Sequence, residues 1–199
     1  MTYIRAEKDQ IDAWEKIGNQ GWNWDNLFPY YKKSESFSIP TKAQISAGAT
    51  YIQDFHGEVG LLKTGYVYQL LNGSFHETVN ISWNHLGLPL NFDVNGGYMR
   101  GFNVWPGTIN RELYLREDAA TAYYYPFQNR SNLVVFLNTT VNKIIWKNGN
   151  TSNAIAEGVE IRSSIGTTHT INAGKEVIIS AGSLRSPAIL EHSGVGNPK

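Results

Sequence analysis

A change in residue pattern at Pro126 divides the chain into two stretches that must fold by different rules. Before it, apolar residues recur every three or four positions, which is typical of helices with one buried face. After it, short runs of β-branched and apolar residues are separated by Asn and Gly, which is typical of strands joined by turns. We therefore expect an α/β protein with some α+β character, whose second part is rich in strands.

Five strands are expected after Pro126, at residues 133–137, 141–146, 155–161, 167–171 and 175–180. The dipeptide Asn148-Gly149 is a strong signal for a hairpin turn. The last run centres on Val177-Ile178-Ile179 and predicts a strand that is buried on both faces.

Four helices are expected before Pro126, at residues 10–17, 23–35, 74–86 and 116–125. In the second of these, Asn23 is the expected N-cap. One face of the same helix carries four aromatic or apolar side chains, Trp24, Leu27, Phe28 and Tyr31.

A turn of small residues, Ala181-Gly182-Ser183, follows the last expected strand. It leads into a helix for which Ser186 is the expected N-cap, Pro187 the first helical residue and Gly194 the end. A buried strand, a small turn and a helix N-terminus together allow backbone to approach a phosphate or a dinucleotide. An ordinary connection between a strand and a helix explains the same residues, so both interpretations stay open.

The charge balance argues against a nucleic-acid partner. Seventeen Lys and Arg residues balance seventeen Asp and Glu residues, and no basic excess is left for a phosphate backbone. The absence of cysteine excludes disulfides, thiolate nucleophiles and zinc–thiolate sites. No apolar run approaches the roughly 20 residues that a membrane span needs, so no membrane partner is expected.

Motifs for hydrolysis, nucleotide binding and metal binding are incomplete or missing. Ser183 lacks the G-x-S-x-G pattern, and the chain holds neither a P-loop nor a complete G-x-G-x-x-G. The histidines show no metal-ligand spacing, so no metal is expected and all five are expected to be surface or turn residues. They are His56, His76, His85, His169 and His192.

Acceptor sequences for N-glycosylation favour a secreted protein. They occur at Asn72, Asn80, Asn129, Asn138 and Asn150. An Asn-rich composition with unused acceptors is the alternative explanation.

The segment Gly182–Gly196 resembles the second signature of the glucose–methanol–choline (GMC) family of flavoprotein oxidoreductases at each constrained position. Three further segments resemble pieces of the same family: the Trp-rich helix 21–31, the H-G-x-x-G turn 56–60 and the Arg-containing segment 116–120. The resemblance runs from the first residue to the last. It is strongest to the fungal branch that contains FAD-dependent glucose dehydrogenases and glucose oxidases.

The resemblance implies the central part of a longer enzyme with FAD as its cofactor. The G-x-G-x-x-G motif of the family then lies upstream of this chain and its catalytic histidines lie downstream, so no catalytic residue is assigned here. Residues 1–49 and 113–199 are expected to belong to the FAD-binding domain, and residues 50–112 to the substrate-binding domain. The isolated chain is expected to be inactive.

The resemblance also implies a set of cofactor-binding residues. The start of the chain is expected beside the flavin and the pyrophosphate, one strand position at the adenine, and the small turn near the ADP part. These residues are Met1, Thr2 and Tyr3, then Val141, then Ser180, Ala181 and Gly182.

The implied reaction is oxidation of glucose or a related sugar or alcohol, with hydride transfer to the flavin. The full-length parent is expected to be an extracellular monomer or homodimer, and the choice between oxidase and dehydrogenase stays open. The alternative function is a non-catalytic secreted glycoprotein that uses this fold for carbohydrate or partner binding.

Overall fold

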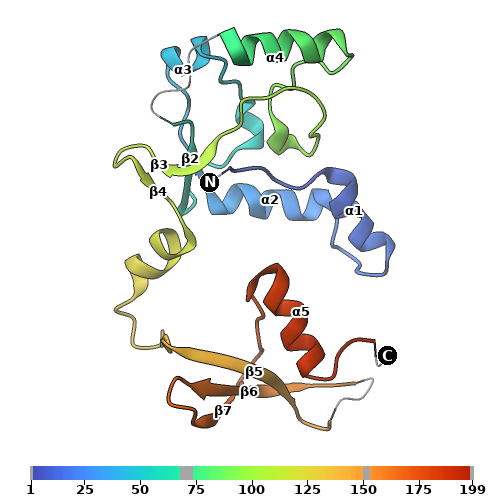
Figure 1. The fold of residues 1–199 in the computed structure, drawn as a ribbon, viewed down its shortest axis with the longest axis vertical. Helices are drawn as coiled ribbons and strands as arrows, with labels where there is room; N and C mark the ends of the chain where they lie inside the picture. Colours follow the sequence, from blue (N-terminus) through green and yellow to red (C-terminus); the bar gives the residue numbers. More distant parts are fainter. Residues whose placement is uncertain (1, 68–73, 150–152, 198–199) are drawn as a thin grey trace. The chain divides into compact units, whose positions relative to one another are not determined.

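The computed structural model describes residues 2–67, 74–149 and 153–197. The predictions that concern Met1, Asn72 and Asn150 therefore lie outside the described residues. The chain forms two compact units, Met1–Leu133 and Val134–Lys199, which are coloured blue to yellow and orange to red in Figure 1. Within the described residues, no helix combines the length and the apolar character needed to cross a membrane.

Unit 1 combines helices with a small mixed sheet. Its helices are α1 (Lys8–Lys16), α2 (Trp24–Ser34), α3 (Lys42–Ser46) and α4 (Ser74–His85). Its strands are β1 (Glu35–Phe37), β2 (Leu62–Gly65), β3 (Gly107–Asn110) and β4 (Leu115–Arg116), in the order β1-β2-β3-β4. β1 and β2 are parallel, whereas the other two pairs are antiparallel. Short helical turns are η1 (Gln53–Phe55), η2 (Val94–Gly96), η3 (Ala120–Tyr124) and η4 (Tyr125–Phe127).

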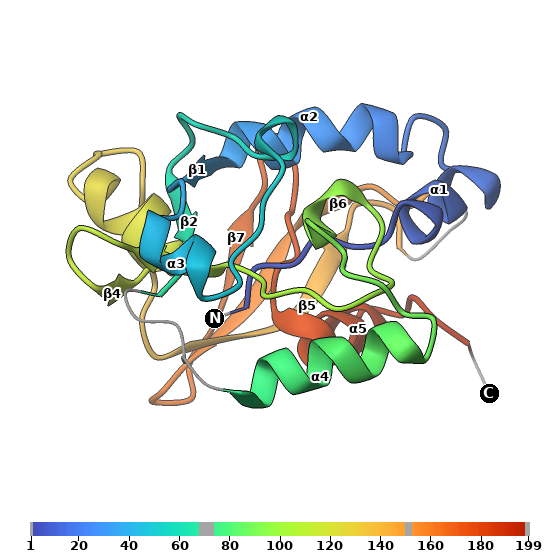
Figure 2. The same cartoon turned by 90° about the horizontal axis from the view of Figure 1, so that it is seen from above.

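β1 runs directly out of α2 (Figure 2), and its last residue, Phe37, belongs to the core of unit 1. Phe37, Ala49 and Tyr66 make up the buried cluster, and Tyr51 and Val104 pack against it. The Asn23 side chain accepts a hydrogen bond from the Asn26 amide and begins α2 as expected.

Unit 2 is a three-stranded antiparallel meander with one helix on it. Its strands are β5 (Thr139–Trp146), β6 (Ala156–Ser163) and β7 (Thr168–Asn172), and α5 (Gly182–His192) packs against β5 (Figure 1). The Ile144 amide donates to the Ser193 hydroxyl at 2.7 Å, and the Trp146 indole N–H donates to the Ser193 carbonyl at 2.7 Å. These two bonds join the end of the helix to the edge strand β5.

The mixed helix and strand composition is confirmed, and so are three of the five strands expected after Pro126. The predictions of strands at 133–137 and 175–180 were wrong. Neither segment has a strand partner among the described residues, and Leu137 and Ile178 expose 79% and 76% of their surface. Apolar, β-branched composition gives a tendency to extend, while a strand also needs a neighbour for its backbone groups.

Two helix starts also differ from expectation. α5 begins at Gly182 rather than at Pro187, so Ser186 lies inside the first turns and does not cap the helix. From there the Ser186 hydroxyl accepts the Ala181 amide at 3.0 Å. Its end at Gly194, with φ +82°, is confirmed. The helix expected at 116–125 starts later, because Arg116 belongs to β4 and the Asp118 carboxylate caps the next turn at the Thr121 amide.

Candidate functional site

An apolar hollow of about 250 Å³ opens in unit 2, between the sheet and the segment that leads into α5. It is lined by Val141 and Ile144 of β5, Val159 of β6, residues 177–181 and Ile189 of α5. Such an open, largely aliphatic surface suits the face of a flat ring.

A wider hollow of about 640 Å³ shares Val141, Ala181 and Ile189 with the first. Its lining also includes polar and charged groups, among them Arg185 and His192 of α5. The apolar and polar parts of this lining together allow unit 2 to take a ligand with a flat ring and a polar extension.

The structure brings several of the expected cofactor residues together here. Val141, Ser180 and Ala181 line the same hollow although about 40 residues separate them in the chain. Gly182 follows with φ +87°, a backbone conformation that residues with a Cβ rarely adopt. No atom lies within 4 Å of the position of a Cβ there, so conformation rather than crowding favours glycine.

The expected residues at the start of the chain lie in unit 1. Thr2 forms an isolated antiparallel bridge with Gly107, and the Tyr3 amide donates to the Pro106 carbonyl at 2.9 Å. The Tyr3 ring is half-buried beside Arg5, whose guanidinium carbon lies 5.7 Å from the ring centre. Met1 lies outside the described residues.

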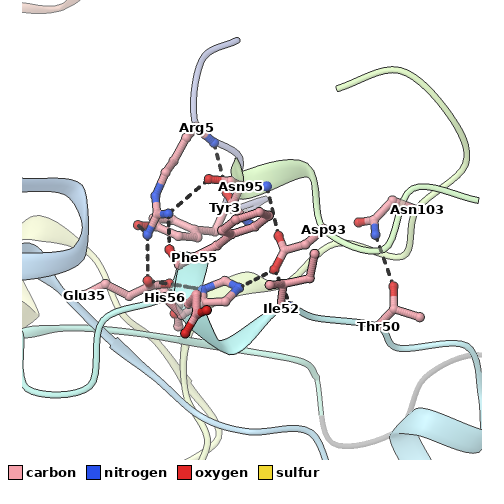
Figure 3. Close-up of polar contacts among 12 residues, drawn as sticks. Tyr3, Arg5, Glu35, Thr50, Ile52, Phe55, His56, Asp93, Asn95 and Asn103 are labelled. Carbon is pink, nitrogen blue, oxygen red and sulfur yellow. Dashed lines mark hydrogen bonds and ion pairs between the residues drawn. The ribbon is translucent and has the colours of Figure 1, made fainter. Parts of the chain in front are cut away.

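Tyr3 adjoins a buried cluster of charged groups around Glu35 (Figure 3). The Arg5 guanidinium contacts the Glu35 carboxylate at 2.7 Å. The same carboxylate accepts the Thr64 hydroxyl at 2.6 Å and the Gly57 amide at 2.9 Å. Glu35 and Thr64 are fully buried, so these contacts replace the water that the carboxylate lost.

His56 lies between two buried carboxylates (Figure 3). Its Nδ1 is 3.0 Å from Glu35 Oε1, and its Nε2 is 2.8 Å from Asp93 Oδ2. The Phe37 ring stacks on the imidazole, with 3.7 Å between ring centres. The histidine therefore joins β1 to the loop that precedes η2.

Asp93 and Asn95 close this arrangement into a ring. The Asp93 carboxylate accepts the amides of Ile52 and Asn95, each at 2.9 Å. The Asn95 side-chain oxygen accepts the Arg5 amide at 3.0 Å, which leads back to the first member. We call the ring Arg5–Glu35–His56–Asp93–Asn95 the buried charge ring.

The members of the buried charge ring shift one another's pKa values. Burial alone lowers the pKa of His56, but hydrogen bonds to Asp93 and Glu35 outweigh it and the net shift is upward. Burial raises the pKa of Glu35 and of Asp93, yet contacts with His56 and with neighbouring N–H and O–H groups lower both overall. Two positive groups, Arg5 and His56, thus balance two carboxylates.

Two glycines of the H-G-x-x-G turn bring His56 to this place. A Cβ on Gly57 would lie 1.8 Å from the Lys32 carbonyl oxygen, and one on Gly60 would lie 2.2 Å from the Ser34 carbonyl carbon. Only glycine lets the turn lie this close to the junction of α2 and β1.

Residues 1–199 match the family model described as GMC oxidoreductase. The chain belongs to the GMC oxidoreductases. The resemblance noted in the sequence is thereby confirmed, together with the assignment as a flavoprotein oxidoreductase. The N-terminal domain of this family, which the matched model describes, is the FAD-binding domain, so FAD is the cofactor.

Individual GMC relatives agree. The chain is 46% identical over 188 residues to "Glucose oxidase-like protein fsoC" of Humicola fuscoatra, covering 94% of this chain and 32% of the relative. It is 36% identical over 204 residues to "Glucose oxidase 1" of Penicillium expansum, covering 98% and 33%. It is also 34% identical over 197 residues to "Glucose dehydrogenase [FAD, quinone]" of Drosophila pseudoobscura pseudoobscura, covering 98% and 29%.

Among solved structures, an FAD-dependent oxidoreductase from Chaetomium thermophilum matches with a TM-score of 0.84 and 30% identity, covering 96% of this chain and 32% of that one. The chain therefore spans about a third of the length of these GMC proteins.

The buried charge ring is the part of the GMC chain that sequence reasoning missed. His56 was expected at the surface or in a turn; it follows η1 in a turn but exposes only 3% of its surface. The signal that could have revealed it is the glycine that follows it, because a glycine in a tight turn brings its neighbour close to other backbone. Within the described residues, no group of three or more potential ligands could hold a metal ion.

Proposed function

We propose that this chain forms cofactor-holding and neighbouring parts of an FAD-dependent enzyme that oxidises glucose or a related sugar or alcohol. The observation that carries the proposal is the match of residues 1–199 to the GMC oxidoreductases. Bound FAD supplies the hydride acceptor, and the residues of this chain bind and enclose it. The proposed domain assignment remains 1–49 and 113–199 for the cofactor and 50–112 for the substrate.

The adenine end of the cofactor is assigned to the hollow of unit 2. Val141 offers strand backbone and a small aliphatic side chain at its wall, and Ser180 and Ala181 line the same hollow. The left-handed backbone at Gly182 turns the chain into α5 immediately beside them. These features fit a flat heterocycle followed by a polar chain.

The flavin and pyrophosphate end is assigned to the start of the chain, at Met1, Thr2 and Tyr3. Support comes from the way this segment is held, because Thr2 pairs with Gly107 and Tyr3 bonds to Pro106. A segment fixed by backbone bonds offers a rigid wall to a cofactor. The chain itself contributes no assigned catalytic residue.

Glucose is favoured as the substrate by the names of the two fungal relatives, while the dehydrogenase relative leaves the electron acceptor open. An extracellular location is proposed from the acceptor asparagines. Asn129 and Asn138 are exposed, whereas Asn80 lies half-buried in α4. A monomer or homodimer is proposed for the full-length protein.

The test is to purify the natural protein, record its flavin absorption and add glucose without oxygen. We expect bound FAD and rapid loss of the oxidised flavin absorption. Bound FAD that responds to another alcohol but not to glucose would correct the substrate alone. A protein without flavin and without sugar-dependent dye reduction would support the non-catalytic glycoprotein instead.

A variant separates the adenine assignment from general stability. Ala181→Leu places a larger side chain in the hollow, so we expect FAD to bind about tenfold more weakly with an unchanged melting temperature. Ser164→Leu adds the same side chain at an exposed turn between β6 and β7 and is the matched control. Equal FAD affinity of both variants would contradict the assignment.

A further inference from the structure

The buried charge ring joins four stretches of unit 1 that are distant in sequence. Arg5 comes from the start of the chain, Glu35 from β1, His56 from the turn after η1, and Asp93 with Asn95 from the loop around η2. Arg5, Glu35 and His56 each expose 3% of their surface or less. Because water cannot replace a lost partner at these positions, each contact of the ring depends on its neighbours.

The geometry of His56 requires a proton on each of its nitrogens. Glu35 faces Nδ1 and Asp93 faces Nε2, both within hydrogen-bond distance. A neutral imidazole has one N–H and one lone pair, so it can donate to only one of the two carboxylates. The imidazolium donates to both, and only this form closes the ring.

The charged and titratable groups around His56 come from every segment packed against it. Glu35 and Asp93 contact it directly, and Arg5 lies beyond Glu35. Tyr66, which follows β2, donates its hydroxyl to the Thr50 carbonyl, and burial together with the Asp93 charge raises its pKa. Tyr66 therefore stays neutral beyond the pH at which a free tyrosine loses its proton.

Closing the ring fixes the segment that carries Thr2 and Tyr3. The Arg5 amide bonds to Asn95, and its guanidinium bonds to Glu35 and to the carbonyls of Asn95 and Phe55. At the other end of the segment, Thr2 and Tyr3 pair with residues 106–107. Residues 2–5 are thus held at both ends.

We propose that protonated His56 is a positioning residue that holds residues 2–5 in place for the cofactor by joining Glu35 to Asp93. This rests on the proposed function, which assigns Thr2 and Tyr3 to the flavin end of FAD. His56 acts through Glu35 and Arg5 and does not itself contact the cofactor in this assignment. Loss of its proton at alkaline pH opens the ring and loosens the segment.

The upward shift of the His56 pKa agrees in direction with this proposal. The charged form therefore persists above the pH at which a free histidine loses its proton, which is about 6.5. Alkaline conditions are needed to test the open state.

The experiment is hydrogen exchange of the natural protein at pH 6.5 and 9.5, in wild type and His56→Gln. Rates are read for residues 2–7 and corrected against a β5–β6 peptide of unit 2. At pH 6.5 we expect residues 2–7 to exchange roughly tenfold faster in the variant, because a buried charged hydrogen bond is lost. After correction for the intrinsic rise of amide exchange with pH, we expect raised pH to speed exchange of this segment in wild type and not in the variant. His85→Gln, an exposed histidine at the end of α4, is the matched control and leaves both unchanged.

A second measurement is the circular dichroism of the bound flavin, which reports on the shape of its binding site. We expect the flavin signal of wild type to change between pH 6.5 and 9.5 and that of His56→Gln to be the same at both. Two results overturn the proposal. One is uniformly faster exchange throughout the variant. The other is a corrected exchange rate of residues 2–7 that changes neither with pH nor with the substitution. If the variant does not fold, the wild-type pH series decides alone. Absence of flavin from wild type refutes the proposed function. The exchange data then still test whether the buried charge ring holds residues 2–5.

Discussion

The buried charge ring of unit 1 and the apolar hollow of unit 2 use burial in opposite ways. In unit 1 the charged groups Arg5, Glu35 and His56 are enclosed and paired with one another. In unit 2 the apolar side chains of Val141 and Ile178 line the hollow and yet expose 38% and 76% of their surface. A paired polar cluster fixes backbone with high directionality, whereas an open apolar surface gains stability only when something covers it. The first arrangement suits positioning and the second suits binding.

Removing the central carboxylate is the strongest way to break this contrast. Glu35→Gln leaves Arg5 and His56 buried without their shared counter-charge, so we expect a loss of about 3–5 kcal/mol in the free energy of unfolding. Urea unfolding measures it, and exchange of β5–β6 amides should stay unchanged. Glu112→Gln, whose side chain is 83% exposed, is the control and should change stability by less than about 0.5 kcal/mol. A loss below about 1 kcal/mol in the free energy of unfolding of Glu35→Gln would contradict the role assigned to the buried charge ring.

Crowding the turn beside His56 should have the next largest effect. Gly57→Ala forces a methyl group against the Lys32 carbonyl, where backbone must move, and we expect a loss of about 3 kcal/mol. Gly174→Ala is the matched control, because no atom lies within 4 Å of the added carbon. Thermal unfolding compares the two, and equal stability of both variants would contradict the observed close approach.

The pH dependence of stability should be smaller and should come from unit 1. The raised pKa of His56 gives stability that is complete below about pH 6.5, the unfolded value, and is lost as pH rises through the folded value. The lowered pKa values of Glu35 and Asp93 give stability that is present above about pH 4 and is lost on acidification. Denaturant unfolding between pH 3 and 10 tests both the acid and the alkaline loss of stability. His56→Gln should abolish the alkaline loss of stability. If that loss is unchanged in the variant, it comes from another group.

The smallest effect should come from the link between sheet and helix in unit 2. Ser193→Ala removes the hydroxyl that accepts the Ile144 amide and donates to the Ile189 carbonyl, so we expect a loss of about 1–2 kcal/mol. Faster exchange should be confined to unit 2, and residues 2–7 should be unaffected. Ser164→Ala in the exposed turn is the control. A response of equal size in both units would show that they do not unfold separately.

Features that depend on near neighbours were predictable from the sequence. Asn23 caps α2, Gly194 ends α5, and the β5–β6–β7 meander follows the alternating pattern after Pro126. Among the site residues, Val141, Ser180 and Ala181 were named from the family resemblance and do meet at one hollow. Their contact with FAD stays a prediction.

The remaining differences arise where distant residues decide. The runs 133–137 and 175–180 have strand composition but no strand beside them among the described residues, and the local pattern carries no information about partners.

The sequence by itself determined the family, the cofactor and most helices and strands, because motifs, caps and periodicity act over a few residues. Only the tertiary structure showed that His56, which the sequence placed in an H-G-x-x-G turn, is enclosed between Glu35 and Asp93 and linked through Glu35 to Arg5. These residues are 21 to 51 positions away from it, and burial and pairing over such separations arise only when the packed chain excludes water and brings the charges together.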